Sequence, residues 1–104
     1  SDVTVEELKE KMDQGDSFVL VDVRENDEFE HSHIKGAIHI PLGLLSSEYD
    51  GLDDSQVYIM QCRSGVRSAK AAQFLVENGF EHVSNLVGGI IDWSEKIDPD
   101  MTVM

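Results

Sequence analysis

The chain has 104 residues, a length that suits one domain around one hydrophobic core. Its 21 acidic and 8 basic side chains give a formal net charge of -13, which argues against nucleic acid and against an anionic membrane as partners. No apolar run approaches the roughly 20 residues of a membrane-spanning helix, and the single cysteine cannot form an internal disulfide, so we expect a cytoplasmic protein with a free thiol.

The N-terminal third is predicted to contain a helix, a buried strand and a second short helix. Thr4 with Glu7 three residues later fits a capping box, and the apolar residues of 4–14 recur at helical spacing. The apolar run 18–21 is too short for an independent helix and is typical of a strand that is buried on both faces. Residues 26–31 are acidic in their first turn and are predicted to form a short helix.

The rest of the chain is predicted to alternate between strands and helices. Short apolar runs indicate strands, and longer segments with apolar residues at helical spacing indicate helices. Ser68 is the expected N-cap of the longest later helix, and Gly79 is its expected stop. In chain order we predict a strand at 37–40, a helical turn at 42–47, a polar loop at 49–55, a strand at 57–60, a helix at 68–78, a strand at 82–86 and a helix at 90–97.

Strands that alternate with helices at this spacing predict βαβ units. We therefore expect one α/β domain over residues 1–104, with a mainly parallel sheet of four to five strands and helices on both faces. The fifth strand would be a short edge strand at Val3. In open parallel sheets, the loops after the carboxyl ends of the strands form the ligand site. Three segments are predicted to converge there, namely 22–24, the loop that begins at Cys62, and 87–89.

The loop after the predicted strand 57–60 contains the only cysteine, Cys62. A thiol acts as a nucleophile in its thiolate form, and the pKa of an unperturbed cysteine is about 8.5. Backbone N–H groups of residues 63–68 and the positive end of the following helix dipole favour the thiolate, as do the charges of Arg63 and Arg67. The same groups can hold an anion attached to the sulfur.

The flanks of Cys62 are polar, which a buried structural cysteine does not need, so the pattern favours a reactive thiol. Gly65 allows the backbone to curl tightly around the sulfur, because glycine tolerates positive φ. The candidate substrate-binding residues are those that follow the cysteine in the loop: Arg63, Ser64, Gly65, Val66, Arg67 and Ser68.

Two kinds of enzyme use such a loop. Known cysteine phosphatases carry Cys-x5-Arg, whereas Cys62 and Arg67 are separated by four residues, and this tighter loop suits a single sulfur atom better than a phosphoryl group. A cysteine phosphatase or arsenate reductase remains the alternative enzyme, although the sequence places no obvious general acid for a leaving alkoxide and leaves only Asp22 and Asp92 open for that role. A non-catalytic interaction module with the same fold is a further alternative.

Three motifs, in this order, resemble those of a rhodanese (sulfurtransferase) domain over nearly the whole chain. They are Asp22-Val23-Arg24-Glu25 with Glu28-Phe29, His33-Ile34-Lys35-Gly36-Ala37 and Ile40-Pro41; the loop Cys62 to Arg67; and Val87-Gly88-Gly89-Ile90 with Trp93. The loop and the segment 93–99 are similar to the rhodanese domain at the C-terminus of adenylyltransferases that activate ubiquitin-like sulfur carriers in molybdopterin and thiamine biosynthesis. Free-standing relatives are also similar, so both arrangements stay open.

The resemblance implies that Cys62 cycles between thiolate and persulfide, with the loop N–H groups around the outer sulfur and with Arg63 and Arg67 binding an anionic donor. It also implies that Asp22 and Arg24 brace the loop from the neighbouring strand end. The implied donor is a small sulfur anion such as thiosulfate, or a persulfide donor protein. The implied acceptor is thiophilic, with a ubiquitin-like sulfur carrier or a fused adenylyltransferase domain as possible partners.

Two further features qualify these expectations. Ser64 stands where some thiosulfate-specialised members have a basic residue, which argues against a strong preference for thiosulfate. His31 and His33 are two residues apart in a predicted turn, a poor spacing for metal ligands, so we expect no metal. The implied chemistry needs no organic cofactor either.

Overall fold

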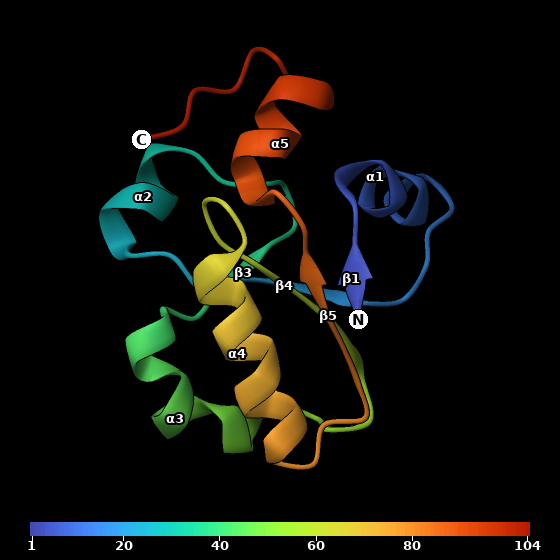
Figure 1. Cartoon of the computed structure of the whole chain (residues 1–104), viewed down its shortest axis with the longest axis vertical. Helices are drawn as coiled ribbons and strands as arrows, with labels where there is room; N and C mark the ends of the chain where they lie inside the picture. The colour runs from blue at the N-terminus through green and yellow to red at the C-terminus, as the bar shows by residue number, and fades with distance from the viewer.

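The computed structural model describes all residues from 1 to 104 and contains a five-stranded sheet (Figure 1). The spatial order of the strands is β1-β5-β4-β2-β3, and every neighbouring pair is parallel. The strands are β1 (Asp2–Val3), β2 (Val19–Asp22), β3 (Ile38–His39), β4 (Val57–Gln61) and β5 (His82–Leu86). This parallel sheet confirms the predicted fold class, and the expected edge strand at Val3 is part of β1.

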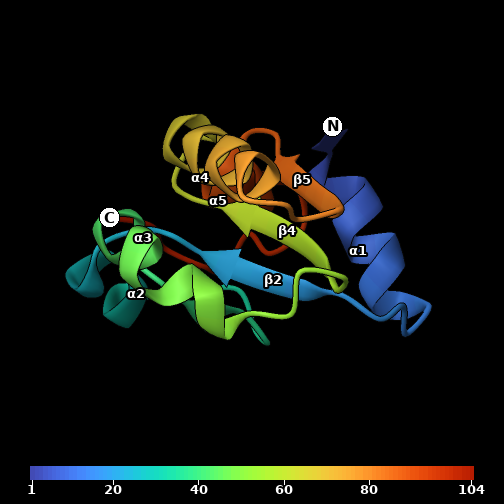
Figure 2. The same cartoon turned by 90° about the horizontal axis from the view of Figure 1, so that it is seen from below.

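Helices cover both faces of the sheet, as predicted. The helices are α1 (Val5–Asp13), α2 (Asn26–His31), α3 (Leu45–Glu48), α4 (Val66–Glu77) and α5 (Gly89–Lys96), with 3₁₀ turns at Leu42–Leu44 and Tyr49–Gly51. α1 and α4 lie on opposite sides of β4 and β5 in both views (Figures 1 and 2). None of these helices combines the length and the apolar character that a bilayer crossing requires.

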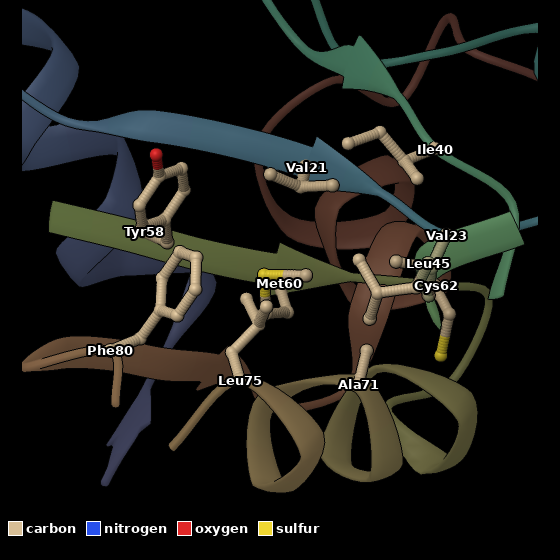
Figure 3. Packing of buried hydrophobic residues seen from close by; sticks show 10 residues of the cluster. All are labelled: Val21, Val23, Ile40, Leu45, Tyr58, Met60, Cys62, Ala71, Leu75 and Phe80. Carbon is tan, nitrogen blue, oxygen red and sulfur yellow. The ribbon is translucent and has the colours of Figure 1, made fainter. Parts of the chain in front are cut away.

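The core is divided into two layers because successive residues of a strand point to opposite faces of the sheet. In β4, Tyr58 and Met60 belong to the layer under α4, whereas Ile59 belongs to the layer under α1 and α5. Ala71 and Leu75 of α4 pack into the first layer (Figure 3). The helices α1 and α5 supply the second layer with Val5, Leu8, Ile90 and Trp93. This alternation explains why the residues 57–60 of β4 form a continuous apolar run.

The beginning of α1 confirms the predicted capping box. The Glu7 N–H donates to Thr4 Oγ1 at 3.1 Å, and the Thr4 N–H donates to Glu7 Oε1 at 2.9 Å. These two hydrogen bonds satisfy backbone donors that a helix start otherwise leaves without partners.

The predicted start of α4 is wrong. The helix begins at Val66, and its N-cap is Gly65 with a φ of 108°, whereas Ser68 was the expected cap. Gly65 adopts the left-handed conformation at little cost, so the chain turns into the helix directly after the cysteine loop. Ser68 is therefore the third residue of the helix, and its hydroxyl faces the end of β4.

Candidate functional site

The carboxyl ends of β2, β4 and β5 lie at one edge of the sheet, because the three strands are adjacent and parallel. The segment after β5 packs on the cysteine loop, with the Ile90 N–H donating to the Cys62 carbonyl at 2.9 Å. The segment after β2 meets the end of β4, where the Val23 N–H donates to the Gln61 carbonyl at 2.9 Å. The structure thus brings together the three segments that the sequence placed at this edge.

Cys62 directly follows β4 and is 1% exposed. Its Sγ accepts a hydrogen bond from the Gly65 N–H at 3.1 Å and another from the Ser68 N–H at 3.3 Å. The Ser68 hydroxyl oxygen lies 3.2 Å from the same sulfur. Figure 3 shows this sulfur at the carboxyl end of β4, beside α4. The loop therefore surrounds the sulfur with N–H and O–H groups that favour negative charge on it.

These contacts change the acidity of the thiol. Burial raises the pKa of Cys62, since a charged thiolate loses hydration inside the protein. The hydrogen bonds from the Ser68 hydroxyl and from the N–H groups of Ser68, Gly65 and Ser64 lower it by more. The net result is a thiol whose pKa lies below its ordinary value, which increases the fraction of reactive thiolate near neutral pH.

Arg67 does not point a free guanidinium at the sulfur. Its Nη1 donates to Glu28 Oε1 at 2.7 Å, and its Nη2 donates to Glu28 Oε2 at 2.9 Å. This two-pronged ion pair joins the start of α4 to α2. It lowers the pKa of Glu28 from 4.5 to about 2 and raises that of Arg67. Glu28 was part of the motif that the sequence singled out, but its pairing with Arg67 was not foreseen.

The other loop residues lie nearer to solvent. Arg63, Ser64 and Val66 are exposed, with Val66 at 64%. The Nε of Arg63 donates to the backbone oxygen of Met104 at 2.6 Å, so the C-terminal segment reaches the loop. Of the two arginines expected to bind an anion, Arg63 is the one at the surface, and Arg67 is paired with a carboxylate.

Asp22 and Arg24 form an ion pair in which both side chains are 0% exposed. The Arg24 Nη2 donates to Asp22 Oδ2 at 2.7 Å, and the same nitrogen donates to the Ser32 carbonyl, also at 2.7 Å. Both bonds hold the segment between β2 and β3. This segment reaches the cysteine loop through the ion pair of Glu28 with Arg67 and through the backbone at the end of β4.

Asn85 is a site residue that the sequence reasoning missed, whereas Gly89 lies in the segment 87–89 that was predicted to converge on the loop. Asn85 Nδ2 donates to the Gly65 carbonyl at 3.1 Å, and its Oδ1 accepts from the Ser68 hydroxyl at 2.5 Å. A Cβ at Gly89, where φ is 58°, would collide with the carbonyl oxygens of Cys62 and Arg63. The polar Asn85 inside a predicted strand was the one signal available from the sequence.

A surface pocket of about 450 Å³ lies between α4 and β5, beyond Asn85. It contains neither Cys62 nor any residue of the loop 63–68, so the thiol is not at its base. The lowered thiol pKa and the converging N–H groups are located at the loop, which makes the loop and not this pocket the candidate site.

Comparison with known proteins gives a family for this arrangement. The family model described as a rhodanese-like domain matches residues 4–96. A relative from Bacillus subtilis with the name "Putative sulfur carrier protein YrkF" is 37% identical over 97 residues, which are 93% of this chain and 52% of that protein. The "Probable adenylyltransferase/sulfurtransferase MoeZ" of Mycobacterium tuberculosis is 36% identical over 106 residues, which are 99% of this chain and 27% of that protein.

The chain therefore spans about half of the first relative and about a quarter of the second. The fold is also shared with a solved structure. The crystal structure of SSP1007 from Staphylococcus saprophyticus matches with a TM-score of 0.86 and 32% identity, over 93% of this chain and 96% of that one. The expected similarity to sulfurtransferase domains fused to adenylyltransferases is thus confirmed.

Proposed function

The chain belongs to the rhodanese-like sulfurtransferase family, and on this premise we propose that Cys62 carries sulfane sulfur from a donor to a thiophilic acceptor. The donor is thiosulfate or a persulfide. The observation that carries the proposal is the loop around Sγ, whose N–H groups at 3.1 and 3.3 Å support a thiolate. In the persulfide, the same loop would surround the outer sulfur atom.

The proposed reaction has two half-reactions. The Cys62 thiolate attacks the outer sulfur of thiosulfate, so that a sulfur–sulfur bond to Cys62 forms, the one within the donor breaks, and sulfite leaves with the bonding electron pair. An acceptor such as cyanide then attacks the outer sulfur of the Cys62 persulfide and leaves as thiocyanate, which restores the thiolate. The chain has no second cysteine, so the second nucleophile comes from another molecule. Ping-pong kinetics are expected.

The test is the intact mass of the protein after incubation with thiosulfate or with a small organic persulfide. We expect the wild type to gain one sulfur atom and to lose it when cyanide is added, with thiocyanate as the product. Cys62→Ser is the matched control, because it keeps a side chain of similar size without the thiol, and it should gain nothing. A wild type that gains no sulfur from either donor would contradict the proposal.

An activity assay with an aryl phosphate distinguishes sulfur transfer from phosphate-ester cleavage. We expect no turnover of that substrate, because the loop has four residues between Cys62 and Arg67 and because Arg67 is already paired with Glu28. Phosphatase activity that disappears in Cys62→Ser would favour the other class of enzyme.

The names of two relatives support a protein as a partner in sulfur transfer. One carries the name of a sulfur carrier and another that of an adenylyltransferase/sulfurtransferase, which supports a protein as the donor or acceptor of sulfur. A ubiquitin-like sulfur carrier and a fused adenylyltransferase domain fit this scheme. A reducing cytoplasm would keep the single thiol available.

A further inference from the structure

Arg67 ends the cysteine loop in the first turn of α4, and its positive charge is already balanced by the carboxylate of Glu28. Both terminal nitrogens contact the two oxygens of Glu28, at 2.7 and 2.9 Å. The Glu28 side chain is 14% exposed, and the pKa of its carboxyl is about 2, so it remains negative at physiological pH. An anion that binds Arg67 must compete with this carboxylate.

Charges of both signs surround this pair. Besides the hydrogen bonds with Glu28, the charge of Glu25 raises the pKa of Arg67, and the charge of Arg24 contributes to the lowered pKa of Glu28. Arg63 and Lys70 remain as cations near the loop, but both are exposed, and water and salt screen exposed charges. The chain as a whole carries a net charge of -13. A dianionic donor therefore meets the thiolate with little compensation from fixed positive charge.

We infer that Glu28 is a specificity-determining residue that withholds Arg67 from the donor and so favours organic persulfides over dianionic sulfur donors. This inference rests on the proposed sulfur transfer. The thiolate attacks the outer sulfur of R–S–SH, a sulfur–sulfur bond to Cys62 forms, and the thiolate R–S⁻ leaves with the electron pair. With thiosulfate the leaving group is dianionic sulfite, whose charge needs a cation that Glu28 keeps occupied.

The variant Glu28→Gln isolates the charge. Glu28 Oε1 also accepts the Glu25 N–H at 3.0 Å, which caps α2. The amide oxygen of glutamine retains this acceptor and one contact to Arg67, so the helix start is preserved. The substitution removes the negative charge and replaces the second acceptor, Oε2, by an N–H donor, so Arg67 Nη2 becomes available to a bound anion.

The kinetic test compares thiosulfate with hydroxyethyl persulfide, a donor without a second charged group, with cyanide as the acceptor. We expect Glu28→Gln to lower the KM for thiosulfate about tenfold, the scale of one charge-assisted hydrogen-bonded pair, and to leave the persulfide nearly unchanged. Glu77→Gln is the control, because it removes the same charge at the opposite end of α4 and should change neither donor. In the double variant Glu28→Gln/Arg67→Ala, the tenfold decrease in the KM for thiosulfate should disappear.

A binding test does not depend on sulfur transfer. Sulfate should protect Cys62 from the uncharged reagent iodoacetamide at about tenfold lower concentration in Glu28→Gln than in the wild type. Equal protection in both proteins, or equal changes for the two donors, would show that the pair with Arg67 only joins α2 to α4. If the wild type uses neither donor, the proposed function fails, and the sulfate test still decides the role of Glu28.

Discussion

Ser68 has one hydroxyl proton and two acceptors within reach, Cys62 Sγ at 3.2 Å and Asn85 Oδ1 at 2.5 Å. When the hydroxyl donates to Asn85, the Ser68 oxygen is free to accept the proton of a neutral thiol. When Cys62 is a thiolate, donation to the sulfur is favoured, because hydrogen bonds to charged groups are the stronger ones. The Ser68 hydroxyl can therefore form a hydrogen bond with Cys62 in both its thiol and its thiolate form, and Asn85 is its second partner.

Replacing Ser68 by alanine removes this hydroxyl and keeps the backbone N–H. Because the Ser68 hydroxyl is the largest of the hydrogen-bonding contributions that lower the pKa of Cys62, that pKa should rise toward its ordinary value in Ser68→Ala. The rate of alkylation near neutral pH should then fall about fivefold, the scale of one hydrogen bond. The measurement is the pH dependence of alkylation by iodoacetamide, whose midpoint should move to higher pH. Ser47→Ala, which removes a hydroxyl bonded to the Leu44 carbonyl, is the control, and an unmoved midpoint in Ser68→Ala would assign the low pKa to the backbone alone.

At the scale of secondary-structure elements, the turn between β5 and α5 decides how closely two segments approach. Gly89 has a φ of 58°, and a Cβ there would collide with the carbonyl oxygens of Cys62 and Arg63. Gly15 has a φ of 70°, but a Cβ there would meet nothing within 4 Å. Alanine substitutions at the two glycines thus separate the free-energy cost of the left-handed backbone from the added cost of a steric collision.

We expect Gly15→Ala to lower the free energy of unfolding by about 1 kcal/mol, which is the cost of the backbone conformation. Gly89→Ala should cost more than twice as much, since the turn must also move away from the cysteine loop. Urea unfolding measures both variants. The midpoint of Cys62 alkylation should rise only in Gly89→Ala, because that displacement disturbs the loop N–H groups. Equal costs for the two variants would mean that the turn relaxes without strain.

For the molecule as a whole, the buried pair of Asp22 and Arg24 connects several elements. Arg24 contacts the Ser32 carbonyl at 2.7 Å, and its own carbonyl lies 2.7 Å from His39 Nε2 of β3. The Nη1 of Arg24 has no hydrogen-bond partner. Asp22 is the carboxylate that hydrogen-bonds this guanidinium, so it supplies the direct compensation of the Arg24 charge.

Removing Asp22 should accordingly be costly. Asp22→Ala leaves the buried Arg24 without its counter-ion, and we expect the free energy of unfolding to fall by about 3–5 kcal/mol. Lys9→Ala breaks an exposed pair with Asp13 and should cost about 0.5 kcal/mol. Urea unfolding near pH 7 compares the two. A small effect of Asp22→Ala would indicate that water reaches Arg24, and that the pair is not an important link between the elements.

Much of the architecture was predictable, because strand and helix periodicities are local properties of the chain. The sequence predicted the capping box of Thr4 and Glu7, the mainly parallel sheet and the position of Cys62 directly after β4. The start of α4 was not, because Ser68 is a favoured N-cap residue, whereas Gly65 carries no capping side chain. In the structure Gly65 is the left-handed N-cap, and its N–H also contacts the Cys62 sulfur, a contact that depends on how the whole loop is folded.

The sequence by itself determined that the protein carries one thiol in a short loop between a strand and a helix, because those features depend on neighbouring residues. Only the tertiary structure decided which groups surround that loop. Glu28 and Arg67 are 39 residues apart, and Ser68 and Asn85 are 17 residues apart. Such contacts arise from the packing of α2, α4 and β5 around one edge of the sheet, and no local pattern specifies them. The charge available to a donor at Cys62 is therefore a property of the fold.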